Sequence, residues 1–535
     1  MSSPTGTDLP ALLTPDEGSP RLERRRWLVL AVVCLAVFVT LLDGTIVNIA
    51  LPSLAVDLNA SNGQLQWVID AYLLVFTGLL LASGSIGDKF GRKRSMIAGL
   101  VLFGATSAYA ASTTTIGGLI TSRALMGIGG ALIFPATLAI ITNVFTDPTE
   151  RAKAIGAWTA VTGMAVAAGP IAGGWLLEHF WWGSIFLVNI PITIIVAVAA
   201  IVIVPESRER NAPRLDITGL IMSIAAITAL VYTIIEAPGW SWLSAKTLVG
   251  FAIAAVLIVV FVVWELRVEH PMLPVSIFKN LRFTAASLSI TAAFFALFGF
   301  IFLITQYFQL VRSYGPLEAG VRSLPVAITI GISSTVAPRI VQRAGTTAVV
   351  RSGLLLFAAG LAWVGVRAGL HTAYIEIVGQ MILLGTGMGL STAPATESIM
   401  GSLSREKAGV GSAVNDTTRE LGSTLGVAVI GSIFSSVYLH HLDHAGGAYA
   451  ALTPALQAQA RSSVGAAHVV ASHLGDQAPA FLLQVNEAFV SGLRIGSITA
   501  AGVAVLGALI AARYLPARVH TRTAELADAL GPHAN

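Results

Sequence analysis

The most regular feature of the chain is the alternation of long apolar runs with short polar stretches. Each run is 18 to 31 residues long, and about 20 apolar residues are enough for a helix to cross the hydrocarbon core of a bilayer. The pattern therefore predicts fourteen transmembrane helices. We place them at 27–52, 64–84, 94–111, 117–144, 152–177, 183–204, 216–235, 247–265, 283–310, 320–341, 348–366, 374–400, 408–438 and 487–512.

The distribution of lysine and arginine predicts on which side of the membrane each connection lies. If the N-terminus is cytoplasmic and the chain crosses at every run, the inner segments hold 24 of these residues and the outer loops hold five. This excess follows the positive-inside rule, and one missed helix would scramble it. The sequence therefore predicts a multi-pass protein of the cell membrane with both termini in the cytoplasm.

Composition supports the membrane assignment and excludes several functions. The chain is 55% apolar and 11% charged, whereas soluble domains are near 25% charged. The single cysteine, Cys34, excludes a disulfide framework and a cysteine-based metal site. The basic residues behind the net charge of +4 are distributed as membrane topology requires, so we expect no nucleic-acid partner. No Walker sequence is found, so direct use of ATP is unsupported, and we expect no cofactor.

The longest polar segment, residues 439–486, lies on the outer side between the last two runs. It begins with His440-His-Leu-Asp-His444, and imidazole and carboxylate groups are suitable ligands for transition metals. We favour a solvated start of a loop over a metal site. Stretches such as Ala451–Val470 are expected to form a surface helix.

Ionisable side chains inside the apolar runs are the main functional candidates. Such a group costs about 2.5–3.5 kcal/mol at the bilayer centre, so its presence suggests a function. At about 1.5 Å of rise per residue, three of these groups share a layer in the outer half of the membrane and Glu420 lies near the midplane. The pattern predicts a water-filled cavity with titratable acids; the alternative is a set of interhelical pairs, such as Asp416 with Arg419. The candidates are Asp43, Asp70, Arg123, Asp416 and Glu420.

The segment after the second run carries a recognisable motif, Gly84-Ser-Ile-Gly-Asp-Lys-Phe-Gly-Arg-Lys-Arg94. Its glycines, which include Gly84 and Gly91, allow the second run to pack tightly and turn sharply, and Asp88 can pair with Arg92. The motif resembles the loop signature of the major facilitator superfamily, Gly-x-Leu-Ala-Asp-x-x-Gly-Arg-Lys. A faint second copy follows the tenth run, near Arg343-Ala-Gly345, as an internal duplication would leave it.

Three further motifs strengthen this resemblance. The stretch Ala165-Val-Ala-Ala-Gly-Pro-Ile-Ala-Gly-Gly174 resembles the antiporter signature Gly-x-x-x-Gly-Pro-x-x-Gly-Gly. Leu41-Leu-Asp-Gly-Thr-Ile-Val-Asn-Ile-Ala-Leu-Pro52, and the stretch around Arg123, resemble motifs of the fourteen-helix drug:proton antiporters. Met126 departs from the family pattern, because it stands where glutamine is usual. The resemblance extends from residue 27 to about residue 518.

The resemblance implies an all-α integral membrane fold of the major facilitator type, acting as a monomer. Two six-helix bundles would be joined by two additional transmembrane helices, fourteen in all. We expect a cytoplasmic tail at 1–26, the first bundle at 27–204, the additional helices at 205–270, the second bundle with its extracytoplasmic loop at 283–513, and a second cytoplasmic tail at 514–535.

The resemblance also implies roles for individual residues. Asp43 would be a coupling acid, Arg123 would assist proton relay, and Asp70 is similar to an acid of members that export organic cations. Asp88 and Arg92 would form a cytoplasmic latch. The residues that would shape the pivot and seal the pathway are Gly169, Pro170, Gly173 and Gly174.

The function predicted from these features is proton-coupled export of lipophilic, cationic drugs or dyes by alternating access, with more than one proton for each cation. The alternative within transport is export of an endogenous metabolite, antibiotic or lipid. A membrane-embedded transferase is disfavoured, because the short inner loops offer no acid- or histidine-rich catalytic segment. A further alternative is a non-transporting sensor, and such a protein would tolerate loss of the intramembrane acids.

Overall fold

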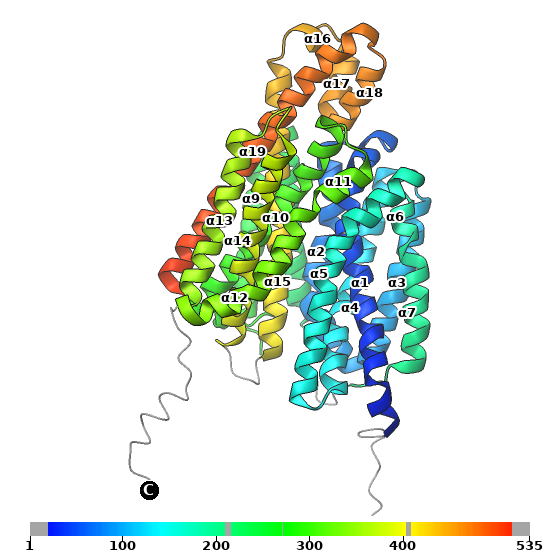
Figure 1. Ribbon diagram of the computed structural model, residues 1–535, viewed down its shortest axis with the longest axis vertical. Helices are drawn as coiled ribbons and strands as arrows, with labels where there is room; N and C mark the ends of the chain where they lie inside the picture. Colours follow the sequence, from blue (N-terminus) through cyan, green and yellow to red (C-terminus); the bar gives the residue numbers. More distant parts are fainter. Residues whose placement is uncertain (1–19, 209–215, 270, 403–407, 516–535) are drawn as a thin grey trace, which may run out of the picture.

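The protein is a bundle of long, roughly parallel helices (Figure 1). The computed structural model describes residues 20–208, 216–269, 271–402 and 408–515. Within these residues fourteen helical segments are long and apolar enough to cross a membrane, and they confirm the fourteen predicted runs. The long helices are α1 (Pro20–Asp57), α2 (Asn62–Phe90), α3 (Arg92–Ser112), α4 (Ile116–Val144), α5 (Pro148–His179), α7 (Asn189–Ile203), α8 (Ile217–Trp240), α9 (Ala245–Glu265), α10 (Leu281–Gln306), α12 (Leu324–Ala344), α13 (Thr346–Arg367), α14 (Tyr374–Met400), α15 (Ala408–Asp443) and α19 (Ala478–Tyr514). Shorter elements are α6 (Ser184–Leu187), η1 (Val275–Lys279), the π-helical turn η2 (Tyr307–Val311), α11 (Pro316–Arg322), α16 (Gly447–Ala450), α17 (Pro454–Ser462), α18 (Val464–Ser472) and η4 (Gly475–Gln477).

The long helices form two bundles that are packed in the same way. In the first bundle α4 packs against α2 and α3, and in the second α14 packs against α12 and α13. Small residues let these helices approach closely. A Cβ atom on Gly99 of α3 would lie 2.7 Å from the carbonyl oxygen of Gly129 in α4, and one on Gly353 of α13 would lie 2.9 Å from that of Gly387 in α14. The same packing device therefore recurs in both halves of the chain.

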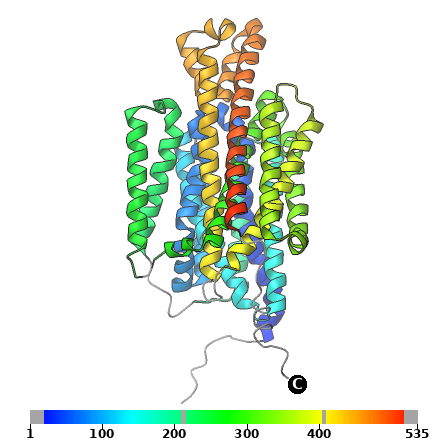
Figure 2. The same cartoon turned by 90° about the vertical axis from the view of Figure 1, so that its left-hand side faces the viewer.

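The two additional helices, α8 and α9, stand beside the bundles as an antiparallel pair, the green helices at the left of Figure 2. Helix α8 packs against α2 of the first bundle and α15 of the second, whereas α9 packs chiefly against α8. Most of the α9 surface is apolar and exposed. Helix α8 therefore lies at the junction of the two bundles, and α9 faces outward.

The motif between the second and third membrane helices is more helical than the sequence suggested. Helix α2 continues through Phe90, so Gly84 and Asp88 lie on it, and α3 begins at Arg92. Only Gly91 connects the two helices, with a φ of +114° that favours glycine. Gly345 makes the same one-residue connection between α12 and α13, with a φ of +82°. The second copy of the motif thus preserves the turn.

The segment at 439–486, which we expect on the outer side, is folded rather than an open loop. Helices α15 and α19 extend into it, and α16, α17 and α18 complete it (Figures 1 and 2). The helix expected over 451–470 is divided in two at Ser463, whose backbone is extended. We call residues 444–477 the cap, the end of the molecule that carries it the cap end, and the opposite end, where α1 begins, the terminal end.

Candidate functional site

Asp43 of α1 and Arg123 of α4 form a buried ion pair. The guanidinium group contacts Asp43 Oδ2, and Arg123 Nε donates to the backbone carbonyl of Val68 in α2 at 3.0 Å. Asn189 of α7 donates to Asp43 Oδ1 at 2.8 Å. Both charged side chains are at most 1% exposed. The pair thus joins four helices of the first bundle in a site closed to solvent.

Tyr72 of α2 completes this cluster. Its ring centroid lies 4.5 Å from the guanidinium carbon of Arg123, within range of a cation–π interaction. Met126, which stands where the family usually has glutamine, offers only its sulfur, 3.8 Å from Arg123 Nη1. Sequence reasoning missed Tyr72 and Asn189, although each is a polar residue inside an apolar run and could have been flagged for that reason.

Asp70 lies in the same layer as this cluster but in different surroundings. It is fully buried, and neither carboxyl oxygen has a hydrogen-bond partner among the residues that the structure describes. One turn away in α2, Leu74 packs in a cluster with Val231 of α8 and Ala428 of α15. One turn in the other direction, Gln66 packs against α15. Asp70 therefore occupies an apolar junction of α2, α8 and α15.

The remaining candidates form a third cluster on the terminal-side half of α15. Arg419 Nη1 lies 3.9 Å from Asp416 Oδ1, and Arg419 Nη2 donates to Thr396 of α14 at 2.9 Å. The Asp416 and Arg419 side chains are 21% and 32% exposed, and Glu420 is half-buried. The five candidates thus form three clusters rather than one cavity lining.

The glycines of the α5 motif pack against both bundles. Cβ atoms on Gly169 and Gly173 would collide with Thr45 and Ile46 of α1, in the same bundle. A Cβ atom on Gly174 would lie 2.6 Å from the Leu317 Cα atom in α11, which belongs to the other half of the chain. A Cβ atom on Gly320 of α11 would likewise collide with the carbonyl oxygen of Pro170. The motif therefore allows backbone-to-backbone contact where the bundles meet.

The contacts between the bundles gather in the cap-side half. Gln309 of η2 donates to the carbonyl oxygen of Ile49 in α1 at 2.8 Å, and α11 packs on α5 as described. Toward the terminal end, the acids of α15 are partly exposed. The structure is therefore closed at the cap end and more open toward the terminal end.

Asp88 and Arg92 are paired, as the sequence suggested. Their side chains lie 2.8–2.9 Å apart and are partly exposed. Arg92 also donates to the carbonyl oxygen of Ala139 in α4 at 3.5 Å. The pair joins α2, α3 and α4, all in the first bundle.

The histidines at the start of the outer segment do not assemble a metal site. In the described part of the chain, no group of three or more His, Cys, Asp or Glu side chains could hold a metal ion. Asp443 is engaged by Arg461 of α17, and the ring of His444 lies 2.8 Å from the carbonyl oxygen of His440.

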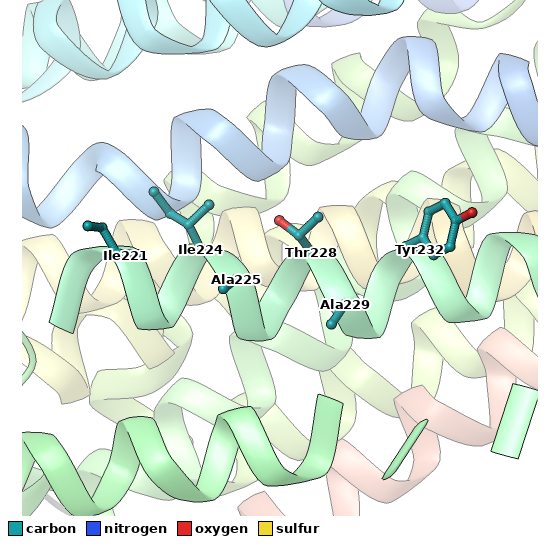
Figure 3. A pocket seen from close by; sticks show the side chains of 6 residues that line it. All are labelled: Ile221, Ile224, Ala225, Thr228, Ala229 and Tyr232. Carbon is teal, nitrogen blue, oxygen red and sulfur yellow. The ribbon is translucent and has the colours of Figure 1, made fainter. Parts of the chain in front are cut away.

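A groove of about 500 Å³ runs along α8, but it carries no charged group (Figure 3). It is open and apolar, and Ile221 and Tyr232 in its wall are 62% and 46% exposed. Such a surface suits lipid chains, so we do not place the ion-coupling chemistry there. The lining residues are Ile221, Ile224, Ala225, Thr228, Ala229 and Tyr232.

Comparison with known proteins identifies the family. The family model described as Major Facilitator Superfamily matches residues 33–427. The chain belongs to the Major Facilitator Superfamily. This major facilitator protein is 35% identical to the multidrug efflux pump LfrA of Mycolicibacterium smegmatis, over 92% of this chain and 98% of the relative. It is 34% identical to the methyl viologen resistance protein SmvA of Salmonella typhimurium (87% and 93% covered) and 31% identical to the tetracenomycin C resistance and export protein of Streptomyces glaucescens (93% of each).

Solved transporter structures share the fold. A bacterial homologue of the human lysosomal transporter Spinster superposes with a TM-score of 0.66 at 15% identity, covering 94% of this chain and all of that one. A D-xylose–proton symporter gives 0.59 at 13% identity, covering 92% and 98%. The protein is therefore a membrane transporter of the major facilitator fold rather than an enzyme.

Proposed function

We propose that this transporter exports lipophilic cations from the cytoplasm in exchange for protons, as a monomer in the cell membrane. The names of its relatives, two of which are a multidrug efflux pump and a methyl viologen resistance protein, support the substrate class. The excess of basic residues in the segments at the terminal end supports a cytoplasmic location for that end. The cap then lies outside the cell.

The single observation that carries proton coupling is the state of Asp70. A buried carboxylate without a hydrogen bond or a counter-charge is strongly destabilised, whereas the neutral acid is tolerated in an apolar junction. In the conformation described here, with the cap end closed, Asp70 therefore holds a proton. Release of that proton toward the cytoplasm would create the negative charge to which a cation binds.

We assign Asp43 a different role from that of the proton carrier. Its carboxylate is neutralised by Arg123 and hydrogen bonded by Asn189, so both charges are stable in the interior. This pair, with Asn189, links α1, α4 and α7, and it places the guanidinium group of Arg123 against the ring of Tyr72. The family resemblance implied that Asp43 is the coupling acid; we propose that Asp70 has this role instead.

The acids of α15 would attract the substrate. Asp416 and Glu420 carry two negative charges against the single positive charge of Arg419, and all three reach partly exposed space on the terminal side. A cation entering from the cytoplasm would meet this net negative surface before it reaches Asp70. Export would follow when the terminal side closes and the cap side opens.

The energetics favour more than one proton for each cation. Exchange of one proton for one monovalent cation moves no net charge, so the membrane potential, about 2.3 kcal/mol per charge at 100 mV, contributes nothing. The pH gradient alone then supplies about 1.4 kcal/mol per pH unit. A second proton, for which Glu420 is our candidate carrier, would restore the contribution of the potential.

Export of an endogenous antibiotic remains the second candidate, since one relative is a tetracenomycin C resistance and export protein. The same coupling would apply to it. Resistance to several unrelated cations on expression of this protein would favour drug export, and resistance to one neutral antibiotic alone would favour the second candidate.

The test uses inverted membrane vesicles in which a pH gradient drives ethidium uptake. We expect Asp70→Asn to abolish proton-driven uptake, because the amide cannot exchange a proton. The matched control is Asp443→Asn in the outer segment, which should transport normally. Full proton-driven uptake by Asp70→Asn would refute the proposal.

A further inference from the structure

Gln66 is a buried amide with an unused donor. Its side chain is fully buried in α2, and within the described part of the chain its Nε2 atom has no hydrogen-bond partner. The Oε1 atom accepts a long hydrogen bond of 3.4 Å from Ser432 of α15, but that hydroxyl group donates at a better distance, 2.8 Å, to the carbonyl oxygen of Ile234 in α8. An amide donor left unsatisfied in a protein interior is unfavourable, so its presence calls for a reason.

Asp70, whose two oxygens are unused acceptors, lies one helical turn from Gln66. The two residues are four apart on α2, so their Cβ atoms lie about 5–6 Å apart on one face of the helix. Glutamine and aspartate at this spacing can form a hydrogen bond. Gly431 of α15 gives the amide its room, because a Cβ atom there would lie 2.7 Å from Gln66 Cδ.

We infer that Gln66 is the positioning residue of the proton carrier: its amide group donates to the Asp70 carboxylate that forms when the proton leaves. This inference rests on the proposed function, in which Asp70 carries the proton. The O–H bond of Asp70 breaks, and the proton passes to water on the terminal side. The carboxylate then accepts a hydrogen bond from the Nε2–H group of Gln66. The amide group thereby lowers the cost of a negative charge in an apolar junction.

Other ionisable groups on the packed helices do not replace this amide. Asp43 of α1 and Arg123 of α4 are paired with each other. Glu236 of α8 is half-buried near the cap end, and Glu420 of α15 lies in the cluster on the terminal side. None of these groups provides a hydrogen bond to either Asp70 oxygen. Gln66, one helical turn from Asp70 on α2, is the residue with an unused hydrogen-bond donor.

The test measures ethidium affinity against pH for the purified transporter in nanodiscs. In the wild type, affinity should fall as the pH falls and Asp70 takes up its proton. Gln66→Met fills similar space but lacks the amide, so the midpoint of this curve should move to higher pH by about one unit. Gln380→Met is the matched control: Gln380 of α14 is also buried with an unpartnered Nε2 atom, but it lies in the other bundle.

The outcomes separate the two proposals. A wild-type midpoint in Gln66→Met overturns the role of Gln66, as does an equal shift in Gln380→Met. If Gln66→Met does not fold, Gln66→Asn replaces it: the shorter amide should give a smaller shift in the same direction, and an unchanged midpoint again overturns the inference. If the wild type shows no pH dependence, or Asp70→Asn keeps the wild-type curve, the proposed function itself fails.

Discussion

The buried pair between Asp43 and Arg123 allows a quantitative test of how the first bundle is held together. Removal of one partner of a buried ion pair costs about 3–5 kcal/mol, because the remaining charge has no counter-charge. Arg123 is 1% exposed, so water cannot replace the lost partner. In Asp43→Asn the amide oxygen can still accept from Arg123, so we expect the lower part of this range, roughly 3 kcal/mol.

The double variant distinguishes a charge effect from a packing effect. Arg123→Met alone leaves the Asp43 carboxylate with Asn189 as its hydrogen-bond donor and should also cost about 3–5 kcal/mol. When both substitutions are combined, no uncompensated charge stays buried. The combined loss should therefore be clearly smaller than the sum of the single losses.

The assay is thermal unfolding of the purified protein in detergent, followed by tryptophan fluorescence. A suitable control is Glu318→Gln, which removes the partner of Arg322 in a partly exposed pair and should cost less than about 1 kcal/mol. The reasoning is wrong if either single substitution lowers the unfolding midpoint no more than this control does. It is also wrong if the losses of the two single variants simply add.

Three further predictions follow from the helix contacts. Gly174→Ala should destabilise the cap-closed state by about 1–3 kcal/mol and slow ethidium export, because the added Cβ atom would meet the α11 backbone. Gly156→Ala, whose Cβ atom would meet nothing within 4 Å, should export ethidium normally. Gly91→Ala should lower thermal stability by about 1–2 kcal/mol because of its positive φ, whereas Gly84→Ala, within a helix and uncontacted, should not. Asp88→Asn should change stability by less than about 1 kcal/mol in thermal unfolding, because its pair with Arg92 is partly exposed. If the pair acts as a latch, the same substitution should reduce ethidium uptake by inverted vesicles.

The contacts also suggest why the chain carries two helices more than two six-helix bundles require. Helix α8 closes the junction at which Asp70 lies, and the carbonyl oxygen of Ile234 in α8 accepts from Ser432 of α15. Without α8, one side of this junction would face lipid. Helix α9 in turn covers one side of α8. The additional pair is thus part of the wall around the proposed proton carrier.

The sequence alone determined the membrane helices and the family. Apolar runs long enough to span a bilayer leave little choice, because an unsatisfied backbone in lipid is costly and a helix satisfies its own hydrogen bonds. Motifs are equally local: the turn after the second membrane helix and the contact of Asp88 with Arg92 involve residues no more than four positions apart in the chain. Such features depend on residues that are close together in the chain, so they can be predicted from the amino-acid sequence.

Only the tertiary structure decided which partners surround each intramembrane charge. Asp43 and Asp70 had equal standing as isolated acids in apolar runs. In the structure α4 brings Arg123 to Asp43, whereas no described side chain forms a hydrogen bond with either oxygen of Asp70. The partner of a buried charge comes from helices distant in sequence, and its presence decides whether the charged or the neutral form is stable. The same holds for the outer segment, whose folding into a cap depends on packing against α1 and α19.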